Sequence, residues 1–176
     1  MKRLILRHPG LQTSSAELCS SKYGVRELSL EDDKTFHHGV DLAVPIGTEV
    51  IFDSKFRVSH VGEDSFCGKF VVGWLIDPDI NVRPIRVFMC HLESTDCLPG
   101  LEMSAGEVIA ATGNSGDYTT GAHLHLGVRL HTNGRHSRHD LSYEAAEKAG
   151  YEDPLNHFNF AINDFDNVVV VSPTVV

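Results

Sequence analysis

Positive charge, long apolar runs and closely spaced cysteines are all scarce in this 176-residue chain. Lysine and arginine number 15 against 24 aspartates and glutamates, so the formal net charge is -9 at pH 7. A protein that binds DNA or RNA neutralises phosphates with a cationic surface, and we therefore expect no nucleic-acid partner. The longest apolar run, residues 168–171, is far shorter than the ~20 residues of a membrane-spanning helix, so we expect no membrane insertion.

The beginning of the chain also lacks an export pattern. Only residues 4–6 form an apolar run there, whereas a secretory signal needs about 7–15 apolar residues before its cleavage site. Cys19, Cys67, Cys90 and Cys97 contain no CxxC pair, which argues against a zinc ribbon or a redox motif. Without an export signal, free thiols are the expectation for all four cysteines.

The chain does contain a series of short apolar and β-branched runs separated by Gly, Pro, Asn and Asp. Such spacing predicts a mainly β, single-domain fold of antiparallel strands. The turn-forming residues around 77–81 predict a hairpin between two of these strands. One short helix is expected at 143–149, because Gly150 follows its end and an N-cap candidate precedes it. The expected strands are residues 40–44, 49–52, 70–76, 85–92, 107–111 and 123–130.

Eleven histidines are present, and their positions are more informative than their number. In Phe36-His37-His38-Gly39-Val40-Asp41, the side chains of an extended segment alternate between two faces. His37 and Asp41 then share one face, and His38 points to the other. We therefore expect His37 and Asp41, and not His38, to act together at one centre.

A second segment, residues 121–127, contains two histidines two positions apart in a predicted strand. The imidazoles of His123 and His125 project from one face, about 7 Å apart along the strand. Leu124 and Leu126 are expected to enter the core and to fix the register, because a one-residue slip would exchange the two faces.

A third candidate, His91, ends the apolar run at residues 85–92, in phase with Val87 and Met89. The neighbouring Cys90 raises the alternative of a cysteine–histidine nucleophile. Adjacent strand residues face opposite sides of a sheet. We therefore expect Cys90 to be a small core residue instead of a nucleophile.

Two histidines and one aspartate from separate strands would make a three-ligand set of nitrogen and oxygen donors. Such a set suits catalytic zinc, because the fourth tetrahedral position stays open for water, whereas structural sites usually close with four ligands. Zinc can lower the pKa of a water that it binds to ~7. Two further histidines nearby could take the proton of that water, stabilise an oxyanion and protonate a leaving amine.

Three motifs, in this order, resemble the lysostaphin-type (LytM-like) zinc metalloendopeptidases, which cut peptidoglycan peptides. They read FHHGVDLAVPIGTEV at residues 36–50, FMCHLES at 88–94 and GEVIAATGNSGDYTTGAHLHLGV at 106–128. The resemblance covers roughly residues 23–129. It implies that His37, Asp41 and His125 bind one zinc ion, and that His91 and His123 are the catalytic histidines beside it.

The resemblance also implies a narrow groove on a mainly antiparallel β fold. The peptidase domain is expected at residues 23–160, between an N-terminal lead-in at 1–22 and a tail or edge strand at 161–176. Arg26 lies in a lead-in segment where some relatives bring an arginine near the substrate. An ordinary surface arginine explains Arg26 equally well, and both interpretations stay open here.

The function implied is zinc-dependent hydrolysis of a stem or cross-bridge peptide bond in bacterial peptidoglycan. The lack of an export pattern and of a recognisable wall-binding domain favours a phage lytic enzyme. Such an enzyme is cytoplasmic until lysis, or carried in the virion, and acts on the cell wall. The alternatives are a non-catalytic module of this fold that binds peptidoglycan or regulates a wall hydrolase, and a virion structural component. Retention of all five candidate site residues weighs against the binding or regulatory module. Stoichiometric presence in purified particles, without wall cleavage, would support the structural component.

Overall fold

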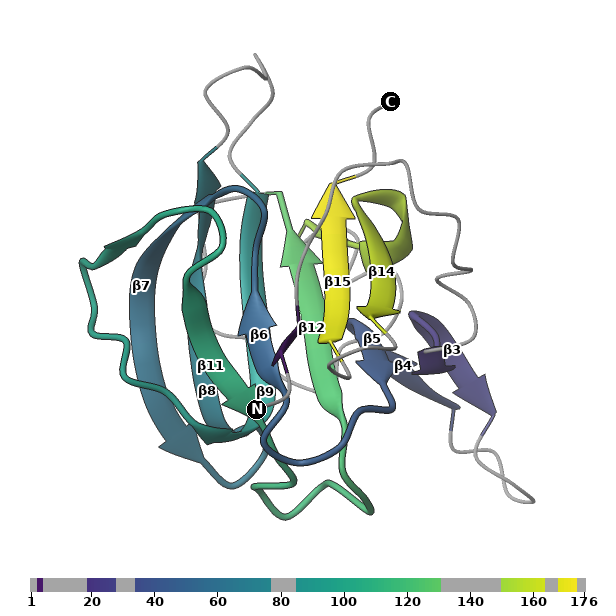
Figure 1. The fold of residues 1–176 in the computed structure, drawn as a ribbon. Coiled ribbons are helices and arrows are strands. Elements are labelled where there is room, and N and C mark those ends of the chain that lie inside the picture. The colour runs from purple at the N-terminus through teal and green to yellow at the C-terminus, as the bar shows by residue number, and fades with distance from the viewer. Residues whose placement is uncertain are drawn as a thin grey trace.

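Strands dominate the computed structural model, which describes residues 3–4, 19–27, 34–76, 85–130, 150–163 and 168–173 (Figure 1). The strands are β1 (Arg3–Leu4), β2 (Cys19–Ser21), β3 (Gly24–Glu27), β4 (Lys34–His37), β5 (Val40–Leu42), β6 (Glu49–Ile51), β7 (Lys55–Asp64), β8 (Gly68–Ile76), β9 (Ile85–Ser94), β10 (Glu102–Met103), β11 (Val108–Thr112), β12 (Leu124–Arg129), β13 (Tyr151–Glu152), β14 (Phe158–Asn163) and β15 (Val168–Pro173). A 3-10 helix, η1 (Pro154–Asn156), lies between β13 and β14. Among the described residues, no helix is long and apolar enough to cross a membrane.

Eleven of these strands form one sheet, and β9 is its central element. β9 pairs with β8 on one side, and with β12 and then β11 on the other. β7 extends the sheet beyond β8, while β5 and β2 extend it beyond β12. The pairs are antiparallel apart from the short parallel pair of β1 with β6. Two smaller antiparallel sheets, β3–β4 and β14–β15, complete the described fold.

The mainly β, antiparallel, single-domain fold predicted from the sequence is confirmed. Each of the six expected strands corresponds to an observed one, with boundaries shifted by one to a few residues. The predicted hairpin is also present as the antiparallel pair of β8 and β9. The turn residues 77–84 and the helix expected at 143–149 lie outside the described residues.

The longest omission from the sequence prediction is β7, a strand of 10 residues. Its sequence, KFRVSHVGED, contains few consecutive apolar residues. Phe56 and Val58 are nevertheless buried, while the flanking Lys55 and Arg57 are exposed. The alternation at its beginning is that of a strand with one face on the core.

Alternation along β12 separates the core from the face that carries the site. Leu124, Leu126 and Val128 are buried in the main hydrophobic core, as predicted for the two leucines. His125 and Arg129 alternate with these three residues along the strand and therefore lie on its opposite face. The register of the sheet consequently decides which side chains meet His125.

The C-terminal segment expected as an edge strand or a tail contains β15, which pairs with β14 along Phe158–Asn163. In Figure 1 this yellow and yellow-green pair lies beside the large sheet, and β15 contacts β6. Phe158 is buried and its ring lies 6.3 Å from that of Phe52. The domain boundaries at residues 23 and 160 remain predictions.

Candidate functional site

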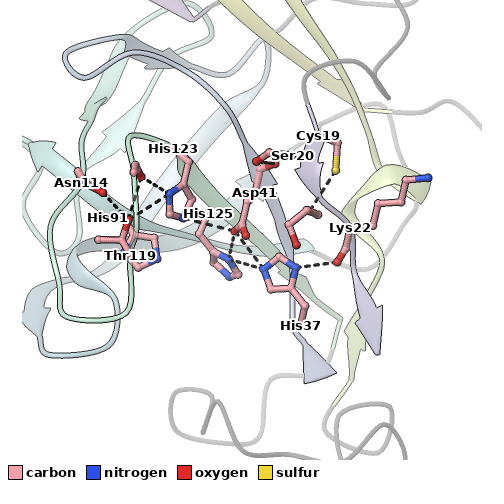
Figure 2. Close-up of polar contacts among 12 residues, drawn as sticks. Cys19, Ser20, Lys22, His37, Asp41, His91, Asn114, Thr119, His123 and His125 are labelled. Carbon is pink, nitrogen blue, oxygen red and sulfur yellow. Dashed lines mark hydrogen bonds and ion pairs between the residues drawn. The ribbon is translucent and has the colours of Figure 1, made fainter. Parts of the chain in front are cut away.

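His37, Asp41 and His125 place three donor atoms at the corners of a nearly equilateral triangle. Nε2 of His37 lies 3.1 Å from Oδ1 of Asp41 and 3.0 Å from Nδ1 of His125. The third side, from Nδ1 of His125 to Oδ1 of Asp41, measures 2.9 Å. Among the described residues, these three form the group whose donor atoms could hold a metal ion. We call this set the donor triangle (Figure 2).

Strand pairing brings the donor triangle together from distant parts of the sequence. Asp41 on β5 lies directly opposite His125 on β12 in the antiparallel register. His37 is the last residue of β4, and a bend at His38 and Gly39 separates it from β5. The predicted pairing of His37 with Asp41 is therefore observed, but the segment is interrupted and not one continuous strand.

Gly39 at this bend is required by the close approach of β12. A Cβ atom there would lie 2.3 Å from the carbonyl oxygen of Leu126 and 2.9 Å from Nε2 of His125. Both distances are far below ordinary van der Waals contact. The glycine of the His-x-Gly-x-Asp pattern thus makes room for the imidazole of His125.

Neighbouring groups orient two members of the donor triangle. Nδ1 of His37 donates to the carbonyl oxygen of Lys22 at 2.8 Å, which directs Nε2 toward the centre. Arg26 donates to Oδ2 of Asp41 at 2.7 Å and leaves Oδ1 facing the histidines. Of the two interpretations of Arg26, neither foresaw this contact. The side chain of Arg26 positions Asp41. The sequence contains no motif whose spacing would connect an arginine on β3 with an aspartate on β5.

His91 and His123 flank the donor triangle on one side (Figure 2). The ring centroids of His91 and His123 are 4.6 Å apart, and the ring centroids of His91 and His125 are 6.1 Å apart. Nδ1 of His91 donates to the carbonyl oxygen of Ser115 at 2.8 Å, and Nδ1 of His123 donates to that of Gly121 at 2.8 Å. Nε2 of His123 lies 3.7 Å from Oδ1 of Asp41. The structure therefore gathers all five predicted site residues in one place.

The backbone at His91 departs from regular strand geometry. Its φ is 61°, whereas the other positive φ angles of the described residues belong to glycines. The pairing of β8 with β9 shifts register here, and the β9 partner changes from β12 to β11. The prediction that His91 stays in phase with Val87 and Met89 is wrong. Those two residues enter the core, while the irregular backbone turns His91 toward His123.

The two neighbours of the predicted site residues take structural positions. His38 is buried between the rings of Phe36 and Tyr151, at centroid distances of 5.1 and 4.9 Å. Cys90 is buried too, with 2% of its surface exposed, and burial raises the pKa of its thiol well above the ordinary value. A thiol held in its protonated form is a poor nucleophile, which agrees with the structural role expected for Cys90.

Burial and hydrogen bonding set the protonation of the donor triangle. Burial lowers the pKa of His125 to about 3, and the hydrogen bond with Asp41 opposes this only in part. Burial alone would raise the pKa of Asp41, but hydrogen bonds with His125 and His37 hold that pKa well below its usual range. At neutral pH the set is thus a carboxylate with a neutral imidazole at His125. Metal ions bind these deprotonated forms.

The sequence profile of peptidase family M23 matches residues 35–139, which is more than half of the chain. The chain therefore belongs to peptidase family M23. This range contains the whole donor triangle and both flanking histidines. The resemblance to lysostaphin-type metallopeptidases inferred from the three motifs is confirmed.

Individual relatives agree with the family assignment. Lysostaphin from Staphylococcus simulans is 28% identical over 104 residues, which are 59% of this chain and 20% of that protein. The solved structure of LytU superposes with a TM-score of 0.58 at 26% identity, covering 84% of this chain and 86% of that one. The catalytic domain of the prophage-encoded M23 protein EnpA from Enterococcus faecalis gives 0.54 at 27% identity, covering 72% and 90%. The chain spans one third or less of the length of the curated relatives that it matches.

Proposed function

We propose that this chain is a zinc-dependent endopeptidase that hydrolyses a stem or cross-bridge peptide bond of bacterial peptidoglycan. The observation that carries the proposal is the convergence of the donor triangle with His91 and His123 on one face of the sheet. Membership of peptidase family M23 and similarity to lysostaphin support the reaction class and the polymer.

In this proposal His37, Asp41 and His125 hold one zinc ion. Two nitrogens and one oxygen with sides near 3 Å fit the donor types and the compactness of a three-ligand catalytic zinc site. When bound, zinc would polarise the scissile carbonyl and lower the pKa of a water at its open position. The backbone carbonyl of Lys22 accepts from His37, and the guanidinium of Arg26 donates to Asp41. These two contacts fix the orientation of His37 and Asp41 before any metal binds.

His91 and His123 handle protons and charge in the same proposal. The carbonyl groups of Ser115 and Gly121 accept from the Nδ1 atoms, so Nε2 of each ring carries the lone pair when the imidazole is neutral. Each Nε2 can then accept a proton from the attacking water or, once protonated, donate to the oxyanion or the leaving amine. Their close spacing allows both to act on one scissile bond.

We further propose that the protein is a phage lytic enzyme, cytoplasmic until lysis or carried in the virion. The likeness to the catalytic domain of a prophage-encoded M23 protein supports this setting. The alternative is a non-catalytic module of the same fold that binds the wall, regulates a hydrolase or belongs to the virion structure. The five retained residues favour the enzyme over that alternative.

The decisive experiment measures the release of soluble muropeptides from purified sacculi of several wall chemotypes. The zinc-loaded protein is compared with chelator-treated protein and with His125→Ala, and mass spectrometry identifies the new termini. His60→Ala is the matched control, because His60 is an exposed histidine on β7, outside the site. Release that requires zinc and His125 supports the endopeptidase. A zinc-loaded protein that releases nothing from any wall favours the non-catalytic alternative.

A further inference from the structure

Two of the four cysteines lie beside one another at an irregular point of the main sheet. The thiol of Cys90 forms a hydrogen bond with the side chain of Cys67. The carbonyl oxygen of Cys67 accepts from the N–H of His91 at 2.7 Å, so Cys67 lies against the peptide group that links Cys90 to His91. The two cysteines therefore meet through both side chain and backbone, although β8 and the beginning of β9 separate them in the sequence.

The pairing between β8 and β9 is interrupted beside these cysteines. The ladder includes Met89 of β9 and resumes at Leu92. It therefore omits Cys90 and His91, where the backbone of β9 is irregular. Cys67 directly precedes β8, at the end of this hairpin that lies away from the β8–β9 connection. A covalent bond between the two cysteines would link the strands where their ladder is broken.

The turn between β7 and β8 orders the backbone of Cys67. Oδ1 of Asp64 accepts from the backbone N–H groups of Phe66 and Cys67, at 2.9 and 2.7 Å. Cys67 is partly exposed, whereas Cys90 is 2% exposed. Both cysteines line a cavity that opens to solvent. A small reagent can therefore approach the pair from this cavity.

The other two cysteines have different surroundings. Sγ of Cys19 donates to the carbonyl oxygen of Ser21 at 3.2 Å. Sγ of Cys97 donates to the carbonyl oxygen of Ile109 at 3.3 Å. All four cysteines are thiols in the structure, but these two are held by backbone carbonyls and not by another thiol.

We infer that Cys67 and Cys90 are a redox modification site, which a peroxide converts into an intramolecular disulfide that fixes the backbone around His91. The thiol of Cys67 attacks one peroxide oxygen, which gives a sulfenic acid and one water. The thiol of Cys90 then displaces the hydroxyl group from that sulfur, which forms the S–S bond and releases a second water. The thiols together lose two electrons and two protons, and the peroxide is reduced to water.

The difference in exposure assigns the two steps of this oxidation. Cys67 is the cysteine that meets the oxidant, because its side chain is partly exposed. Cys90 is shielded from solvent and reacts only with the sulfenic acid that is held against it. In the proposed phage setting, the pair stays reduced in the cytoplasm and becomes oxidised after lysis. The modification itself does not rest on the proposed peptidase activity.

Mass spectrometry of the full chain after treatment with hydrogen peroxide tests the modification. We expect the intact mass to fall by about 2 Da, and non-reducing digestion to give peptides linked through Cys67 and Cys90. Dithiothreitol should reverse both changes. Cys67→Ser should form no such link. Cys19→Ser is the matched control and should still form it, because Cys19 is also partly exposed but lies outside the pair.

The disulfide should also stabilise the sheet beside His91. It closes a loop of roughly two dozen residues, so the melting temperature of the oxidised protein should rise by about 5–10 °C. Hydrogen exchange of the peptide that contains the His91 N–H should slow by about tenfold or more, since its acceptor is the carbonyl of Cys67. Peroxide-treated Cys67→Ser should show neither effect, which separates the disulfide from oxidation of methionine.

A chain that stays fully reduced in peroxide would overturn the inference. A gain of about 32 or 48 Da at Cys67 without a cross-link would do the same, because it would mean sulfinic or sulfonic acid. So would a disulfide that joins two molecules or that uses Cys19 or Cys97. A link between Cys67 and Cys90 that lowers the melting temperature or leaves the exchange unchanged would refute its stabilising role. None of these measurements uses hydrolysis, so their failure is distinguishable from a failure of the proposed peptidase.

Discussion

The donor triangle and the two flanking histidines are held by different parts of the architecture. Asp41 and His125 lie on paired strands and bond to each other across the register of the sheet. His91 lies at a backbone irregularity with a φ of 61°, and His123 forms only an isolated bridge with Gly113. Backbone carbonyls, not strand partners, fix the orientation of these two rings.

Under the proposed function, metal binding and proton transfer therefore have partly separate structural supports. The sheet register places Asp41 opposite His125. The bend after β4 brings His37 to this pair, and local backbone geometry determines where His91 and His123 point. The two functions should therefore be separable by substitution.

Asp41→Ala should abolish both zinc binding and hydrolysis. The substitution removes the negative charge of the donor triangle and leaves Arg26 without its carboxylate partner. Zinc content by mass spectrometry should fall from about one ion per chain to the background level. Asp96→Ala, at an exposed position, is the control and should retain both properties. Full zinc content in Asp41→Ala would refute the assigned ligand set.

His123→Gln should retain zinc and lose activity. The imidazole of His123 contributes no atom to the donor triangle, and loss of a general acid or base costs about 10²–10⁴-fold in rate. Parallel measurements of zinc content and of kcat/KM on sacculus fragments would separate the two effects. If zinc is lost together with activity, then the two supports are not independent.

Arg26→Gln should weaken zinc binding by about 10–100-fold, the usual cost of removing a group that orients a metal ligand. The variant frees Oδ2 of Asp41, which Arg26 holds at 2.7 Å. Competition with a zinc chelator gives the affinity, and Arg57→Gln serves as the control. Unchanged affinity in Arg26→Gln would mean that the strand alone orients Asp41.

The metal-free protein should lose stability as the pH falls below about 6.5. The pKa of His125 is lowered from 6.5 to about 3, so between these values the unfolded chain binds a proton that the folded chain does not. The free energy of unfolding then falls by at most about 1.4 kcal/mol per pH unit. Asp41, whose pKa is also lowered, adds a loss only below pH 3.8. Urea unfolding at pH 7 and pH 5 measures how steeply the free energy of unfolding depends on pH. We expect a weaker pH dependence in His125→Asn, which lacks the titrating imidazole.

Local sequence patterns predicted six of the fifteen observed strands. Together with the family resemblance, they also named the five candidate site residues that the structure brings together. The leucines around His125 alternate as a half-buried strand should, and the structure buries both. β7 was missed because its apolar positions are separated by charged and polar residues. The phase of His91 was wrong, because a register shift between β8 and β9 cannot be read from apolar spacing. The contact of Arg26 with Asp41 joins two separate sheets, and local pattern does not encode such a contact.

The separation of the site residues along the chain has a consequence for biosynthesis. The contact between His37 and His125 closes a segment of 88 positions, and long-range strand pairs form only after the entropy of loop closure is paid. A ribosome must therefore release β12 before β5 has its partner and before the centre can assemble. Every shorter nascent chain lacks His125, so translation itself delays the assembly of the donor triangle until β12 has been made.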